Sequence, residues 1–257
     1  GYNRATAEYL SPSGFAGPNA AFAFLTERHA RATGLERADY ACVPLAQRSW
    51  AAANPGAVYR DPLTLEDYLA APIVAPPLCR FDCVPVVAGA DAIVLRAEPV
   101  GGRPAVRTRA LAARYNDDQQ EGDALRSGFA DLAPELWTAA GVSPGDLDAA
   151  YLYDDYPVMV AIQAADLGLP EDGDLRRWLH ARVLDEHWPL NTSGGQLSAG
   201  QAGAAGGMHG LVEAIRQLRG GAGARQLECR LALVCGYGMV LYRHGAAHAA
   251  VVLERVG

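Results

Sequence analysis

The chain has 257 residues, of which 50% are hydrophobic, so it can bury a large core in one large domain or two smaller ones. Its 22 basic and 29 acidic residues give a formal net charge of −7 without a basic run, which argues against nucleic acid or an anionic membrane as the main partner. The sequence contains no lysine, which excludes a catalytic Schiff-base lysine, a lysine-anchored pyridoxal cofactor and a P-loop lysine.

Cysteine usage and the apolar runs indicate where the protein works. The sequence has five cysteines, an odd number without CxxC spacing, and it opens without a charged and apolar leader. Every apolar run is interrupted by Arg, Asp, Glu, Gly or Pro before it could span a bilayer. We therefore expect a reduced, cytoplasmic protein without a membrane span, and a small molecule or a protein as its partner.

The first third of the chain is predicted to be helical and rich in loops. Apolar residues recur at helical spacing over residues 19–34 and again over 38–55, where Asn54 and Pro55 stop the pattern. Thr64, followed three residues later by Asp67, is typical of a capping box, and prolines end the short helix that follows.

From about residue 90, strands and helices alternate. We predict strands over 90–98, 105–116, 147–154, 229–235 and 246–255, and helices over 121–141 and 157–168. A last helix, stopped by Gly220, has an apolar face made of Met208, Leu211, Val212, Ile215 and Leu218. This alternation predicts an α/β fold, a sheet covered by helices. The segment 98–104, rich in Gly and Pro, is either a domain boundary or a hairpin.

Acidic and phenolic side chains gather in YLYDDYP, residues 151–157, at the end of a predicted strand. Open α/β sheets place their ligands at such strand ends. The two acids, Asp154 and Asp155, beside the three phenols, Tyr151, Tyr153 and Tyr156, could share protons or hydrogen-bond an oxyanion there. The alternative is a helix N-terminus, where acids cap free N–H groups and tyrosines fill a boundary layer. Taken alone, the stretch favours this structural interpretation.

Small residues dominate NTSGGQLSAGQAGAAGG, residues 191–207, ahead of the last helix. The N-terminus of a helix can receive a phosphate or a carbonyl oxygen, because its N–H groups and its dipole converge there. The glycines do not form GxGxxG after a strand, so a Rossmann fingerprint is not met. The spacing is equally consistent with a tight structural crossover.

A strand is expected to end at Gly236, Tyr237 and Gly238, within CGYG. Flanking glycines let a backbone approach a ligand, and they also make ordinary hairpins.

The sequence offers little evidence of a metal site, because the histidines form no HExxH and His244 and His248 do not share a helical face. Cys79 and Cys83 are expected to be small core residues.

Taken in chain order, these segments resemble the thiolase superfamily, and specifically its thiolase-like lipid-transfer protein branch. LCRFDCVPVVAGADAIVL, residues 78–95, resembles the strand that ends the family's first half. SGGQLSAGQAGAAGG resembles the GGxxxxGHPxGxxG loop, and CGYGMV resembles the CxGxG turn. The spacing from Tyr153 to Leu169 matches the segment that starts with NEAF or HDCF. The resemblance covers nearly the whole chain, with four motifs in the family's order.

The resemblance implies a layered αβαβα fold with a mixed sheet, of which this chain holds the last two-thirds and an incomplete N-terminal half. Residues 1–104 would supply a helical loop region and the last strand of the N-terminal thiolase half, and residues 105–257 the C-terminal half. The first strands and the nucleophilic cysteine of a thiolase have no counterpart in the sequence. Cys83 matches a family position other than the nucleophile.

Two site positions depart from the family's pattern. Tyr153 stands where thiolases have the Asn or His that helps to bind the thioester oxygen. Gln201 stands where the GHP histidine activates the cysteine, and a glutamine side chain cannot act as a base. Cys235 does match the first residue of the CxGxG turn. A site with tyrosines in place of imidazoles resembles the aldolases that shorten steroid side chains beside an OB-fold partner of the DUF35 type.

The resemblance thus implies an acyl-CoA carbon–carbon lyase, which cleaves a β-hydroxyacyl-CoA, such as a steroid side chain, into a ketone and a shorter acyl-CoA by a retro-aldol reaction. The implied acid/base residues are Tyr153, Tyr156, Tyr237 and Asp155. The implied substrate-binding residues are Ser193, Gly194, Gly195, Gln201, Cys235, Gly236 and Gly238. No metal and no cofactor are expected, and the expected assembly is a homodimer or a heterotetramer. The alternatives are a degenerate thiolase-like binding or scaffold subunit, and a Claisen thiolase whose nucleophile lies outside this chain.

Overall fold

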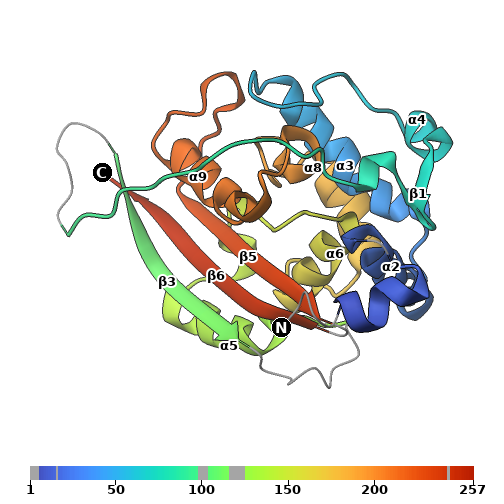
Figure 1. Cartoon of the computed structure of the whole chain (residues 1–257). Helices are drawn as coiled ribbons and strands as arrows, with labels where there is room; N and C mark the ends of the chain where they lie inside the picture. The colour runs from blue at the N-terminus through green and yellow to red at the C-terminus, as the bar shows by residue number, and fades with distance from the viewer. Residues whose placement is uncertain (1–5, 16, 98–103, 116–124, 242–243) are drawn as a thin grey trace.

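The computed structural model describes residues 6–15, 17–97, 104–115, 125–241 and 244–257, and a four-stranded sheet lies at its centre (Figure 1). The strand order is β3-β6-β5-β4, with bounds Ala105–Tyr115 for β3, Ala149–Tyr151 for β4, Leu231–Leu241 for β5 and His244–Val256 for β6. β6 pairs antiparallel with β3 and β5, whereas β4 pairs parallel with β5. The mixed sheet that the resemblance to thiolases implies is confirmed.

Helices cover both faces of this sheet, because successive side chains of a strand point to opposite sides. Leu233 and Cys235 of β5 belong to the larger hydrophobic core, together with residues of α5 (Phe129–Ala140) and α6 (Pro157–Asp166). Ala232 and Val234 belong instead to a second core with residues of α9 (Gly206–Leu218). The α/β arrangement predicted from the alternation of strands and helices is therefore correct.

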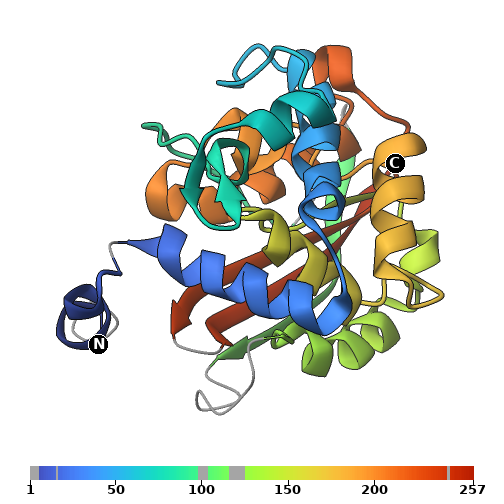
Figure 2. The same ribbon diagram turned by 90° about the vertical axis from the view of Figure 1, so that its right-hand side faces the viewer.

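The N-terminal region is helical, as predicted. α2 (Pro18–Thr33) and α3 (Arg37–Ala52) both contact α6, and α2 crosses in front of the sheet in Figure 2. The capping box is present at α4 (Leu65–Ala70), where Oγ1 of Thr64 accepts the N–H of Asp67 at 3.0 Å. β1 (Ile73–Ala75) and β2 (Leu78–Cys79) form a small antiparallel pair. No helix in the described ranges is both long and apolar enough to cross a bilayer.

Three predicted elements differ from the structure. Residues 90–97 form no strand, and the side chains of Val94 and Leu95 are 82% and 85% exposed. A strand needs a neighbour for its N–H and C=O groups, and no described strand pairs with this segment.

The helix predicted over 121–141 begins at Phe129, after residues 116–124, which lie outside the described part of the chain. β4 ends at Tyr151, three residues earlier than predicted. Residues 98–103 of the expected boundary also lie outside the described residues.

The buried face of α9 includes part of the apolar face that the sequence indicates, since Leu218 is buried in the second core and Leu211 and Ile215 pack against that core. Met208, Leu211, Val212 and Ile215 are only half-buried, whereas the polar side chains of Glu213 and Gln217 are fully buried. A charged side chain is buried at an acceptable free energy only when it is paired, and Glu213 is paired. The polar stripe of α9 therefore faces the molecule's interior and the site described next.

Candidate functional site

A pocket lies beside the end of β4, where three segments meet. The chain leaving β4 contributes residues 151–154, the glycine loop contributes residues between 191 and 196, and the first turns of α9 contribute residues between 206 and 210. Cys235 of β5 also lines the pocket. The pocket therefore forms at the carboxyl end of a strand, where the sequence placed its candidate site.

Backbone pairing with β4 positions the glycine loop. The N–H of Asn191 donates to the carbonyl of Ala150, and the Asn191 side chain donates to the carbonyl of Leu152 at 3.0 Å. Asn191 has a φ of 51°, and Gly194 and Gly195 have φ values of 95° and 60°. Glycine adopts this left-handed backbone without strain and asparagine tolerates it, which explains the residue types of the loop.

The glycines of the loop also lie too close to their neighbours to carry a side chain. A Cβ on Gly195 would lie 2.0 Å from Oδ2 of Asp154, and one on Gly194 would lie 2.5 Å from Cβ of Ala51 in α3. These contacts favour the packing interpretation that the sequence left open. Ser193 and Gly195 line the pocket as well, whereas Gly194 packs against α3.

The structure brings Tyr153 and Gln201 together. Nε2 of Gln201 donates to Oη of Tyr153 at 3.0 Å, and Tyr153 lines the pocket. Burial, reinforced by the charges of Asp155 and Asp154, raises the pKa of Tyr153 to about 12. The phenol therefore keeps its proton at neutral pH. It can donate a hydrogen bond to an oxyanion, but it is a poor base.

Of the two adjacent acids, Asp154 faces the pocket. Its buried side chain accepts the N–H of Leu197 at 3.3 Å, and burial raises its pKa to about 7. Oδ1 of Asp155 is buried with no hydrogen-bond partner among the described residues, and burial together with the charge of Asp154 raises its pKa well above the usual value. Both acids are candidates in the sequence, which favoured Asp155 for the acid/base role, whereas Asp154 is the acid that lines the pocket.

The structure does not bring Tyr156 or Tyr237 to the pocket. Oη of Tyr156 donates to Oδ1 of Asn19 at 2.5 Å, and its ring stacks on Phe22 with centroids 4.1 Å apart. The ring of Tyr237 meets His248 edge-on, with centroids 5.0 Å apart. The predicted acid/base tyrosines therefore occupy three separate environments.

β5 does not end at the glycines that flank Tyr237. The strand continues to Leu241, so the strand end expected at residues 236–238 is wrong, and Gly236 and Gly238 pair with Ala249 and Ala247 of β6. The antiparallel partner β6 continues the ladder beyond these positions, which keeps the strand extended. Cys235 does line the pocket, and burial raises the pKa of its thiol, which stays protonated at neutral pH.

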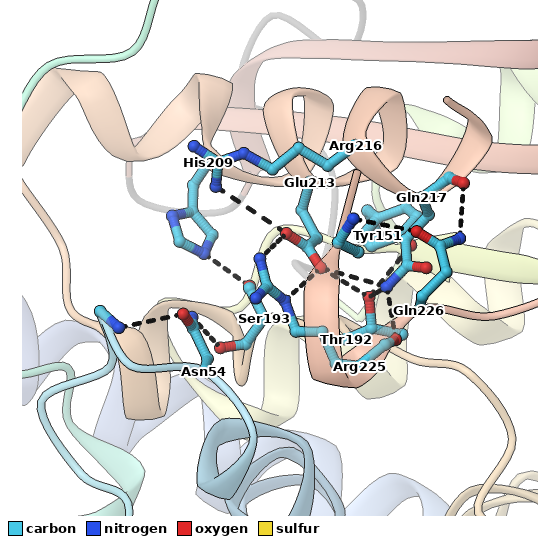
Figure 3. A network of polar contacts seen from close by, with 12 residues as sticks. Asn54, Tyr151, Thr192, Ser193, His209, Glu213, Arg216, Gln217, Arg225 and Gln226 are labelled. Atoms are coloured by element: carbon cyan, nitrogen blue, oxygen red, sulfur yellow. Dashed lines mark hydrogen bonds and ion pairs between the residues drawn. The ribbon is translucent and has the colours of Figure 1, made fainter. Parts of the chain in front are cut away.

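A serine and a histidine form a close pair in the same pocket. Oγ of Ser193 lies 2.7 Å from Nε2 of His209, in the first turn of α9. The carbonyl of Ser193 accepts the side-chain amide of Asn54 at 2.8 Å (Figure 3). Burial lowers the pKa of His209, so its imidazole is neutral at pH 7. His209 was missed by sequence, although it lies four and eight residues before Glu213 and Gln217, on one helical stripe.

A buried ion pair anchors the glycine loop from the other side. Arg225 donates to both carboxylate oxygens of Glu213, at 2.8 and 2.7 Å. Oγ1 of Thr192 donates to the same carboxylate at 3.1 Å, and Gln217 donates to Thr192 at 3.1 Å (Figure 3). Every member of this network is buried, so it fixes the distance between the loop and α9.

The described residues contain no group of three or more His, Cys, Asp or Glu side chains that could hold a metal ion. Cys79 is buried in a small hydrophobic cluster, and Cys83 packs against the main core. Both positions agree with the core role expected from the sequence.

Comparison with known proteins shows which family and which relatives this chain resembles. The family model described as "Thiolase C-terminal domain-like" matches residues 111–255. A 17-hydroxy-3-oxo-4-pregnene-20-carboxyl-CoA lyase of Mycobacterium tuberculosis is 34% identical over 223 residues, which are 81% of this chain and 57% of that protein. A steroid side-chain-cleaving aldolase of Thermomonospora curvata is 30% identical over 233 residues, 86% of this chain and 59% of that protein. The chain thus spans less than two-thirds of the length of these relatives.

Solved structures show the same fold. An Ltp2-ChsH2(DUF35) aldolase superposes with a TM-score of 0.78 at 23% identity, over 99% of this chain and 68% of that one. A monomeric SCP2-thiolase-like protein of Mycobacterium smegmatis superposes with a TM-score of 0.63 at 18% identity, over 94% of this chain and 52% of that one. With the family model matched over more than half of its residues, the chain belongs to the thiolase C-terminal domain-like family.

Proposed function

We propose that this protein is an acyl-CoA carbon–carbon lyase, which cleaves a β-hydroxyacyl-CoA into a ketone and a shorter acyl-CoA by a retro-aldol reaction. The observation that carries the proposal is Tyr153, which lines the pocket of a thiolase-like fold and accepts a hydrogen bond from Gln201. It places a protonated phenol and a neutral amide where an imidazole base is expected. The relatives named as a CoA lyase and as a steroid side-chain-cleaving aldolase support this reaction class.

The reaction needs two functional groups from the protein. A base must take the proton of the β-hydroxyl group as the Cα–Cβ bond breaks, and a hydrogen-bond donor must stabilise the thioester enolate that receives the bond's electrons. Tyr153 is suited to be the hydrogen-bond donor, because its raised pKa keeps the O–H intact while Gln201 holds the phenol oxygen by a hydrogen bond. A ketone product requires that the β-carbon of the substrate carry two carbon substituents besides its hydroxyl group.

The described groups favour cleavage over Claisen condensation. Condensation needs a thiolate nucleophile and a base beside it. Burial raises the pKa of Cys235, and Gln201 has no titratable nitrogen. The retro-aldol route needs no covalent cysteine, and we propose that it proceeds without a cofactor.

The proposed partner protein and substrate class rest on the comparisons with known proteins. We propose that the protein works beside an OB-fold partner of the DUF35 type, because the aldolase structure that it resembles is a complex with a DUF35 protein. A steroid acyl chain is the proposed substrate class, from the names of the two relatives. A homodimer or a heterotetramer is the proposed assembly.

The experiment incubates the full-length protein and its copurifying partners with a β-hydroxyacyl-CoA whose β-carbon is tertiary. Mass spectrometry then measures the ketone and the shorter acyl-CoA. The control is the same thioester without the hydroxyl group, which retro-aldol chemistry cannot cleave. Release of both products from the hydroxylated thioester alone is the expected result. A pure complex that binds the thioester without turnover would support a scaffold role, and CoA-dependent cleavage of a β-ketoacyl-CoA would support a Claisen thiolase.

A further inference from the structure

The pocket offers three titratable groups besides the tyrosines for the proton of the β-hydroxyl. The Cys235 thiol is buried and protonated. Asp154 also lines the pocket, but its Oδ2 is engaged by the glycine loop, since it accepts the N–H of Leu197 and would lie 2.0 Å from a Cβ on Gly195. The third group is His209, which is only half-buried and lies next to Ser193. The thiol already carries its proton at pH 7 and the Asp154 carboxyl is engaged by the loop, so the neutral imidazole is the group with a lone pair free for the proton.

The surroundings of His209 fix its ring against Ser193. Glycines lie beside it in the first turn of α9, and Gly207 and Gly210 line the same pocket. The 2.7 Å distance between Oγ of Ser193 and Nε2 of His209 is that of a strong hydrogen bond. The serine is held in turn, since its carbonyl accepts the amide of Asn54 (Figure 3). Both partners of the pair are therefore positioned before substrate arrives.

We infer that Ser193 and His209 form a proton relay that removes the β-hydroxyl proton, an inference that rests on the proposed function. With Nδ1 protonated, Nε2 of His209 accepts the O–H of Ser193. The substrate hydroxyl gives its proton to Oγ of Ser193 while Ser193 passes its own proton to Nε2. The Cα–Cβ bond breaks, its electrons form the enolate, and the C–O bond becomes the ketone carbonyl. The proton then returns through Ser193 to Cα of the enolate, which restores His209 and completes the shorter acyl-CoA.

Charges around His209 set the pH range of the relay. Burial lowers the pKa of His209, the charges of Asp91 and Glu213 oppose this shift, and those of Arg216 and Arg225 add to it. The other titratable groups that line the pocket are Tyr151, Tyr153, Asp154 and Cys235. Because the relay needs a neutral imidazole, kcat is expected to fall as the pH drops through the lowered pKa of His209.

The test compares His209→Asn with the matched control His187→Asn in the full-length protein and its copurifying partners. His187 stacks on Trp50 outside the pocket and has a φ of 53°, a conformation that asparagine tolerates. We expect His209→Asn to lower kcat by about 10²- to 10⁴-fold, to change KM little, and to abolish the acid limb of the kcat–pH profile that His209 causes. His187→Asn should keep the wild-type rate and profile.

Further variants keep the inference falsifiable. Ser193→Ala should also lower kcat, and its kcat–pH profile should lack the acid limb that the wild type shows. His209→Gln replaces His209→Asn if the latter does not fold. A wild-type rate and pH profile in the folded His209 variant overturns the relay while the lyase activity of the wild type stands. An acyl ester on Ser193, detected by intact mass, overturns it as well, because the serine would then be a nucleophile. A wild-type protein that releases no ketone overturns both the relay and the proposed function.

Discussion

The side-chain amide of Gln201 donates to the phenol oxygen of Tyr153 at 3.0 Å, across a sequence separation of 48 residues. Glutamine cannot exchange protons, so this bond orients the phenol without competing for its proton. The bond turns Tyr153 into a fixed donor, whereas an imidazole at position 201 would add a base beside it. Tyr153 and Gln201 both depart from the thiolase pattern that the sequence resembles, and we expect them to act as one unit.

Tyr153→Phe tests the donor role. The variant removes one hydrogen bond to the enolate, so we expect kcat to fall by about 10²- to 10³-fold while KM changes less. Tyr156→Phe is the comparison, since its hydroxyl contacts Asn19 rather than the pocket. It should keep kcat and lose about 1 kcal/mol of unfolding free energy. Steady-state kinetics and urea unfolding measure both variants, and a large loss of kcat in Tyr156→Phe would instead support the acid/base role predicted from the sequence.

Periodicity predicted those parts of the fold that depend on local pattern. The strands over 105–116 and 246–255 and the helices α2, α3 and α6 were predictable, because each buries a face with the period of its own element. The segment 90–97 has the same apolar alternation but lacks a pairing strand in the described residues, and periodicity cannot report a missing neighbour.

The candidate site was only partly predictable, because its members are sorted by contacts between distant residues. Tyr153 and Gln201 were placed together by their motif positions. Tyr156 was not distinguishable from Tyr153 in sequence, since its partner Asn19 lies 137 residues away. His209 was missed because the apolar residues of α9 dominate its pattern. Polar residues spaced by four on a helix usually form a solvent-exposed face. In α9 this face is buried instead, because Glu213 pairs with Arg225.

Removing the buried carboxylate of Glu213 should destabilise the protein strongly. Glu213→Ala leaves the guanidinium of Arg225 buried without its partner, and we expect a loss of about 3–5 kcal/mol in the free energy of unfolding. Arg216→Ala is the control, because that guanidinium is exposed and lies 4.0 Å from the same carboxylate. It should change stability by less than about 1 kcal/mol. Equal urea midpoints for the two variants would contradict the anchoring role of the ion pair.

Gly195→Ala should distort the pocket. The new methyl group would overlap Oδ2 of Asp154, and the residue would be held at a φ of 60°. We expect a lower unfolding midpoint and weaker binding of the thioester. Gly207→Ala in α9 is the matched substitution, since a Cβ there meets no atom within 4 Å, and alanine favours a helix by about 1 kcal/mol. Thermal unfolding should therefore order the proteins as Gly207→Ala, wild type and Gly195→Ala, from most to least stable.

The raised pKa of Asp154 predicts how stability depends on pH. The folded carboxyl, with a pKa of about 7, holds a proton that the unfolded chain releases near pH 4. The folded state therefore binds more protons between these values, and the free energy of unfolding falls as the pH rises through this window. Asp155 acts in the same direction. Asp154→Asn cannot ionise, so its stability should fall less steeply between pH 5 and pH 8 in urea unfolding. Asp131→Asn, on the exposed side of α5, should keep the wild-type slope. A slope in Asp154→Asn as steep as that of the wild type would mean that Asp154 is already ionised in the folded protein at pH 5.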